Sequence, residues 1–103
     1  MPDKATTLRP SEIIRDYSIY PRQNVNDYNI GAYAESMRAE VEFPPPIVER
    51  KTKRLGDGFH RAAAWSRVHG DDPMQVVLRD YPDDQALVTD AVRLNSGHGQ
   101  RLT

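Results

Sequence analysis

A strand-to-helix transition in the middle of the chain constrains the fold more than any other feature. The residues Gly56-Asp57-Gly58 are a turn signal, and the alanine-rich stretch Phe59–His69 that follows has high helix propensity. Gly70 then supplies a helix C-cap. The small side chains of the alanine run let a neighbouring backbone approach closely. We therefore expect an extended chain up to the turn and a helix directly after it.

Apolar periodicity and turn residues predict the other elements. In chain order these are a short edge strand with a turn over Leu8–Asp16, a helix over Asn29–Ala39 capped by Asn29, a strand over Ile47–Arg50 that follows three prolines, a hairpin tip at Lys51–Arg54, a strand over Met74–Asp80, a helix over Asp83–Leu94 and a loop from Asn95. We expect residues 1–7 to be disordered, as unanchored termini are. Residues 8–103 then form one α+β domain, a small mixed sheet with about three helices.

Composition excludes several classes of protein. The 103 residues include no cysteine, so disulfides, thiolate metal sites and cysteine nucleophiles are excluded. The formal net charge is −1, so bulk positive charge does not direct the chain to nucleic acid. No apolar run approaches the roughly 20 residues of a membrane helix, and the N-terminus lacks the apolar segment of a secretory signal. We interpret the chain as cytoplasmic, with no membrane contact.

The first turn of the predicted central helix is a candidate anion site. The first N–H groups of a helix have no intrahelical partner and carry the positive end of the helix dipole. Gly58 lets a phosphate approach the backbone, while His60 and Arg61 add side-chain donors. Arg61 can bind two phosphate oxygens at once. The region is also basic, because residues 50–67 include six lysines and arginines against the single acid Asp57.

Simpler interpretations of the same residues stay open. A Gly-x-Gly pair is more often a plain turn than a phosphate loop. Lys51–Arg54 fits a solvated hairpin tip, and Asp57 fits a helix cap as well as a functional group. Trp65 and Val68 fit core positions.

Several stretches resemble the ParB/sulfiredoxin superfamily: Pro46–Val48, Leu55–Ala64, and Asn95 with the downstream His98-Gly99 and Arg101–Thr103. The resemblance extends from about Ile19 to Thr103, and Asp-Gly-Phe-His-Arg before an alanine-rich helix is its most specific part. It is strongest with the ParB-like domains, often described as nuclease domains, of phage and bacterial regulators. Members bind a nucleoside triphosphate: ParB proteins use CTP as a DNA-clamp switch, and sulfiredoxin uses ATP in catalysis. The resemblance therefore implies a ParB/sulfiredoxin-like fold with CTP or ATP as ligand.

The resemblance places the family's phosphate-binding turn on Gly58, Phe59, His60 and Arg61. ParB has Gly-Glu-Arg-Arg at these positions, and sulfiredoxin has Gly-Cys-His-Arg. This placement agrees with the anion site inferred from the start of the helix. Phe59 stands where sulfiredoxin has its catalytic cysteine, and the chain has no thiol, so sulfiredoxin chemistry is excluded.

Three residues outside the turn complete the predicted site. Asn95 matches the asparagine of the ParB Glu-Asn motif, which helps to hold magnesium and phosphate. Leu94 replaces the glutamate of that motif and supplies no oxygen, although magnesium requires oxygen ligands. The resemblance thus implies a nucleotide without a complete magnesium site. We expect Asn95 and His98 to close the far side of the phosphates, and Arg22 resembles an arginine that faces the ligand cleft in many members.

Three classes of function follow from these observations. The first is a nucleotide- or anion-binding domain of a DNA-associated regulator or partition-type protein, in which the ligand changes homodimerisation or DNA association. DNA contact then falls to a C-terminal helix-turn-helix domain that this sequence does not contain. The alternatives are a metal-dependent nuclease or phosphotransferase of the same fold, and a structural or interaction domain that has lost the ligand. We assign no catalytic residue and no metal ligand.

Overall fold

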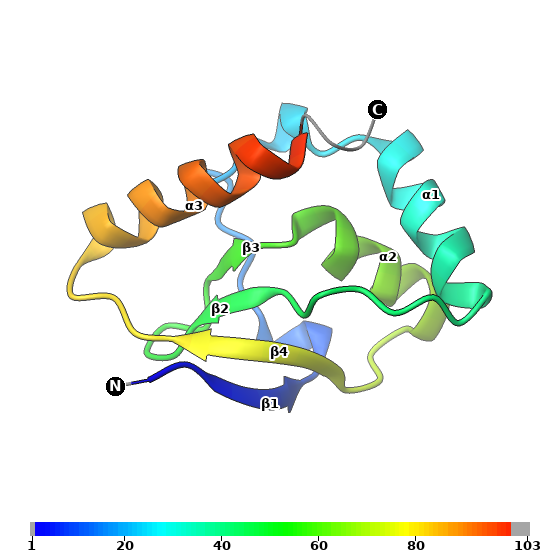
Figure 1. The fold of residues 1–103 in the computed structure, drawn as a ribbon, viewed down its shortest axis with the longest axis horizontal. Helices are drawn as coiled ribbons and strands as arrows, with labels where there is room; N and C mark the ends of the chain where they lie inside the picture. The colour runs from blue at the N-terminus through cyan, green and yellow to red at the C-terminus, as the bar shows by residue number, and fades with distance from the viewer. Residues whose placement is uncertain (1, 100–103) are drawn as a thin grey trace.

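Residues 2–99 form a four-stranded sheet and three α-helices (Figure 1). The structure is a computed structural model, and it describes these residues apart from the side chains of Arg22 and of residues 95–99. The elements in chain order are β1 (Lys4–Leu8), the 3-10 helices η1 (Pro10–Glu12) and η2 (Arg22–Asn24), α1 (Asp27–Arg38), β2 (Ile47–Glu49), β3 (Leu55–Asp57), α2 (Phe59–His69), β4 (Met74–Arg79) and α3 (Asp84–Gly99). The α+β class predicted from the sequence is confirmed.

The sheet has the strand order β1-β4-β2-β3 and mixed directions. Strand β1 is antiparallel to β4, β4 is parallel to β2, and β2 forms an antiparallel hairpin with β3. Along β4, Met74, Val76 and Leu78 are buried while Gln75 is exposed, which is the alternation that the sequence predicts. The two elements of the transition, β3 and α2, are joined by Gly58 alone.

The main core lies between the sheet and α2. Val48 and Leu55 on the hairpin pack with Val76 on β4 and with Phe59 and Ala62 on α2. Helix α2 spans the predicted residues, and the Gly70 N–H caps it by donating to the Ser66 carbonyl oxygen at 2.9 Å. Helix α1 packs against α2 (Figure 1).

The N-terminal prediction is wrong. Residues 4–8 form β1 instead of a disordered segment, because the free edge of β4 offers hydrogen-bond partners to this polar stretch. Asp3 and Arg79 hold the start of the strand with an ion pair of 2.8 Å. The predicted edge strand over Leu8–Asp16 is instead largely η1 and an isolated bridge between Ile14 and Arg54.

Two helix boundaries also differ from the prediction. Helix α1 starts earlier, because the Asn26 side chain caps it by accepting the Asn29 N–H at 2.8 Å. Helix α3 extends to Gly99, although a loop from Asn95 is predicted. No proline interrupts this stretch, and glycine within a helix costs only about 1 kcal/mol relative to alanine.

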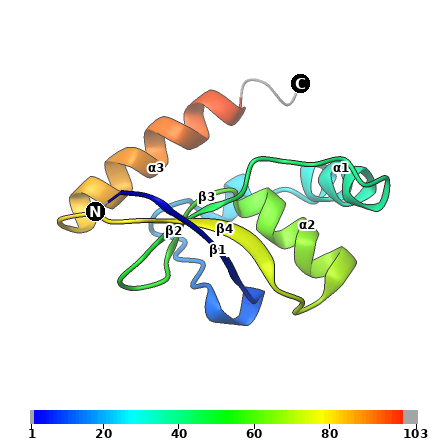
Figure 2. The ribbon, with the colours of Figure 1, turned by 60° about the horizontal axis from the view of Figure 1, so that its bottom comes forward.

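Helix α3 is attached to the sheet by its first half. Leu87 and Ala91 are buried against Ile19 in a second apolar cluster, and Arg79 pairs with Asp90 at 2.9 Å. Figure 2 shows the helix rising away from the sheet toward its C-terminal end. Within residues 2–99, no helix has the length and apolar character needed to cross a bilayer.

Candidate functional site

The predicted anion-binding turn requires glycine at position 58 for two reasons. Gly58 is the N-cap of α2 with φ of +94°, a region that residues with a side chain rarely adopt. A Cβ atom at this position would lie 3.0 Å from Arg61 Nη2 and 3.0 Å from Pro46 Cβ. Backbone conformation and close packing therefore both exclude a larger residue.

Arg61 is buried and paired with an acid on the other side of the turn. Its Nη2 atom donates to Asp57 Oδ2 at 2.9 Å, and the two side chains are 7% and 6% exposed. Its Nη1 atom donates to the Pro44 carbonyl oxygen. Arg61 thus ties the end of β3 and the proline segment to the first turn of α2. Sequence reasoning missed this role, because the identity of the partner depends on how the turn folds.

His60 is held by the segment that precedes α1. The Asn26 N–H donates to His60 Nε2 at 3.1 Å, so this nitrogen carries no proton. Burial lowers the pKa of His60, and a hydrogen bond to the Asn24 backbone opposes that shift. The neutral imidazole joins η2 and α1 to the first turn of α2.

Aromatic rings cover the same turn. The Tyr20 ring stacks on Phe59 at a centroid distance of 4.9 Å and lies edge-on to His60 at 6.0 Å. Tyr17 contacts Phe59 at 6.3 Å, and burial raises the pKa of Tyr20. No sequence signal marks Tyr17 or Tyr20 as neighbours of the turn, because only the folded chain brings residues 17–26 against α2.

Solved ParB structures share this arrangement of sheet and helices. A Pnob8-like ParB-N domain aligns with a TM-score of 0.72 and 16% identity, over 94% of this chain and 37% of that chain. The C-terminally truncated chromosome-partitioning protein ParB from Caulobacter crescentus, complexed with CTP-γ-S, aligns with a TM-score of 0.74 and 17% identity, over 91% of this chain and 53% of that chain. The chain has the ParB N-terminal fold. The ParB-like fold that the resemblance implies is therefore confirmed.

A sequence relative comes from a regulatory protein. The transcriptional regulator NovG from Streptomyces niveus is 35% identical over 96 residues, which are 93% of this chain and 26% of that protein. The ParB-like domain therefore spans about a quarter of this relative's length. No protein-family model matches the chain.

The other predicted site residues lie on two elements outside the turn. Arg22 opens η2, in the same segment as the two residues that bond to His60. Asn95 and His98 lie in the C-terminal part of α3, and their side chains, like that of Arg22, are outside the described part of the structure. Leu94 is half-buried on α3 beyond the buried Leu87 and Ala91.

The basic stretch of the sequence is largely neutralised by the fold. Ion pairs join Arg50 to Asp80, Arg54 to Glu49 and Asp84, Arg61 to Asp57, and Arg67 to Asp27. Most of these acids lie on other elements, so counting charges along the chain misses them. Among the described side chains, no group of three histidine or acidic residues is placed to hold a metal ion.

The state of His60 makes the stability of this ParB-like domain depend on pH. A lowered pKa in the folded state means that the folded domain binds fewer protons than the unfolded chain below about pH 6.5. The free energy of unfolding should therefore be highest above pH 6.5 and fall as the pH drops through the lower folded pKa. Urea unfolding between pH 7.5 and 5.5 measures this slope.

The slope should become shallower in His60→Gln, since glutamine accepts the Asn26 N–H without titrating. An unchanged slope in His60→Gln would show that other groups cause the pH dependence.

Proposed function

We propose that this ParB-like domain is the nucleotide-binding module of a DNA-associated regulator or partition-type protein, with the phosphates at Gly58–Arg61. One observation carries the proposal: α2 starts at Gly58, which has no side chain to cap it, and has no acidic residue in its first turn, so the positive end of the helix dipole favours an anion there. The ParB of Caulobacter crescentus, which has this fold, is complexed with CTP-γ-S. The regulator NovG supports the assignment to a regulatory protein.

The residues of the turn have different roles in this proposal. Gly58 and Phe59 are buried and His60 is half-exposed, so an anion reaches the helix start from the side of His60. Arg61 neutralises Asp57, which removes a negative charge that would repel phosphate. Arg61 is then a positioning residue whose guanidinium keeps the turn in place.

The rest of the proposed site comes from η2 and α3. In this proposal Arg22 on η2, and Asn95 and His98 on α3, supply the remaining contacts to the phosphates. The ligand is a nucleoside triphosphate, CTP or ATP, and magnesium is secondary because Leu94 supplies no oxygen. Homodimerisation and DNA association are the properties that the nucleotide would control.

Nucleotide binding should raise the melting temperature. A ligand that binds only the folded state at 100 times its dissociation constant adds about 2.7 kcal/mol to the free energy of unfolding. For a domain of this size we expect a rise of about 10–20 °C. Thermal unfolding with CTP, ATP, GTP and UTP, each with and without magnesium, measures the shift and identifies the base.

A charge change in the first turn tests the site without removing the fold. In His60→Glu the new carboxylate is favourable at a helix N-terminus but repels phosphate, so this variant should lose the nucleotide-induced rise in melting temperature. His60→Gln should retain that rise. Equal shifts in both variants would contradict the proposed site. No shift with any nucleotide would favour a domain without a ligand, and magnesium- or manganese-dependent phosphate release or plasmid nicking by the wild type would favour the enzyme.

A further inference from the structure

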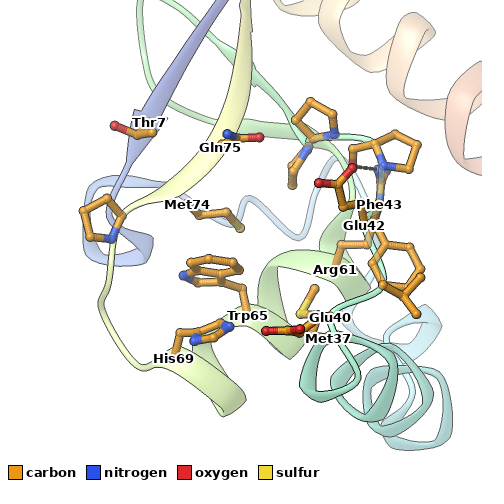
Figure 3. Close-up of a pocket in the computed structure, with 15 residues that line it drawn as sticks. Thr7, Met37, Glu40, Glu42, Phe43, Arg61, Trp65, His69, Met74 and Gln75 are labelled. Atoms are coloured by element: carbon orange, nitrogen blue, oxygen red, sulfur yellow. Dashed lines mark hydrogen bonds between the residues drawn. The ribbon is translucent and has the colours of Figure 1, made fainter.

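A groove of about 680 Å³ lies beside Arg61, between the proline segment, the end of α1 and the C-terminal half of α2 (Figure 3). Its floor is mostly apolar, with Met37, Phe43, Trp65 and Met74 from four different segments and the three prolines of residues 44–46. In Figure 3 the Trp65 ring and Met74 stand opposite Phe43 and Arg61. The volume lies within the range of about 300–1,000 Å³ that is usual for small-molecule sites.

The aromatic walls of the groove are fixed before any ligand enters. Trp65 Nε1–H donates to the Asp72 carbonyl oxygen at 2.8 Å, and His69 lies against the indole at 4.2 Å. On the opposite wall, the Phe43 ring meets Tyr33 edge-on at 5.0 Å. A rigid aromatic face can bind both a cation and an apolar surface of a ligand.

Among the groove's lining residues, negatively charged side chains outnumber positively charged ones. Glu40 and Glu42 line it, and within the described residues neither carboxylate has an ion pair or a side-chain hydrogen bond. The one guanidinium in the lining, that of Arg61, is already neutralised by Asp57 at 2.9 Å. His69 is the other titratable group of the lining.

Glu40 occupies a backbone position that favours glycine. It follows the C-cap of α1 with φ of +62°, and its N–H donates to the Met37 carbonyl oxygen while the Val41 N–H donates to that of Ser36. This is the Schellman arrangement, in which glycine is the usual residue at this position. Local stability therefore does not explain why a carboxylate stands here at the rim of the groove.

We propose that the groove binds a small organic cation, with its apolar body over Trp65 and Met74 and its charge at Glu40 and Glu42. Cation–aromatic attraction selects a positively charged ligand, and so do the carboxylates of Glu40 and Glu42, which have no ion pair among the described residues. The groove shares Arg61 with the proposed nucleotide site, whereas Glu40 and Glu42 lie outside the Gly58–Arg61 turn.

Tetraphenylphosphonium and tetraphenylborate test the charge preference, because they have nearly the same shape and opposite charge. Trp65 is the only tryptophan of the chain, so its fluorescence reports on the groove directly. We expect saturable quenching by the phosphonium and none by the borate at the same concentration. Equal responses to both ions, or no saturable response to the phosphonium, would overturn the proposal.

Two substitutions of Glu40 separate binding from folding. Glu40→Gln should weaken phosphonium binding about fivefold or more, and Glu40→Gly should weaken it similarly while raising the melting temperature. Glu35→Gln, on α1 but outside the groove, is the matched control and should keep wild-type affinity. Unchanged affinity in both Glu40 variants, or complete displacement of the phosphonium by CTP, would overturn the proposed site.

Discussion

Replacing Arg61 with alanine should lower the free energy of unfolding by about 3–5 kcal/mol, because it leaves the Asp57 carboxylate buried without its cation. Asp57 is 6% exposed and lies 2.9 Å from the guanidinium that neutralises it. The same substitution also removes a donor from the Pro44 carbonyl oxygen. Urea unfolding of the ligand-free protein at pH 7 measures the loss.

An exposed ion pair on the same helix provides the control. Arg67 pairs with Asp27 at 2.6 Å, but the two side chains are 41% and 87% exposed, so Arg67→Ala should cost no more than about 1 kcal/mol. The double variant Asp57→Ala/Arg61→Ala should lose less than the two single variants together, since it leaves no buried unpaired charge. A loss in Arg61→Ala as small as that in Arg67→Ala would contradict the structural role of the pair.

The prediction also changes how a binding experiment on Arg61 is interpreted. From the sequence, Arg61 is a phosphate ligand whose removal weakens binding directly. In the structure its guanidinium is committed to Asp57 and to Pro44. Lost nucleotide affinity in Arg61→Ala would therefore reflect a disturbed turn as well as a lost contact, which is why His60 is the better position for a charge test.

Local signals account for the elements that the sequence predicts correctly. Helix α2 is bounded by Gly58 and Gly70, and β4 shows its alternation in consecutive residues, so neither depends on distant partners. Strand β1 does depend on one: its residues pair with β4 about 70 positions further along the chain. The polar sequence of β1 carries no apolar pattern that reveals this pairing.

The candidate site also has one part that the sequence predicts and another part that it does not. The turn at Gly58 follows from adjacent residues and could be predicted. The burial of Arg61 and the neutral state of His60 could not, because Pro44 and Asn26 reach them only through the packing of separate segments.

Gly58→Ala should lower the free energy of unfolding by about 2–5 kcal/mol and disturb the start of α2. A residue with a Cβ in the left-handed region costs about 1–2 kcal/mol, and overpacking of a close contact adds about 1–3 kcal/mol. Both apply here, since φ is +94° and the new methyl group would lie 3.0 Å from Arg61 Nη2 and from Pro46 Cβ. If Arg61 moved to relieve its contact with the new methyl group, it would move away from Asp57. The steric strain and the loss of the buried ion pair are therefore coupled.

The same substitution at Gly31 should have the opposite sign. Gly31 lies within α1, where an added Cβ would meet only Arg67 Nη1 at 3.9 Å, so Gly31→Ala should raise the free energy of unfolding by about 0.5–1 kcal/mol. Urea unfolding of both variants beside the wild type measures the pair of effects. If Gly58→Ala were as stable as the wild type, the turn would be able to relax without glycine. The close approach of Arg61 and Pro46 would then not determine the conformation of the first turn of α2.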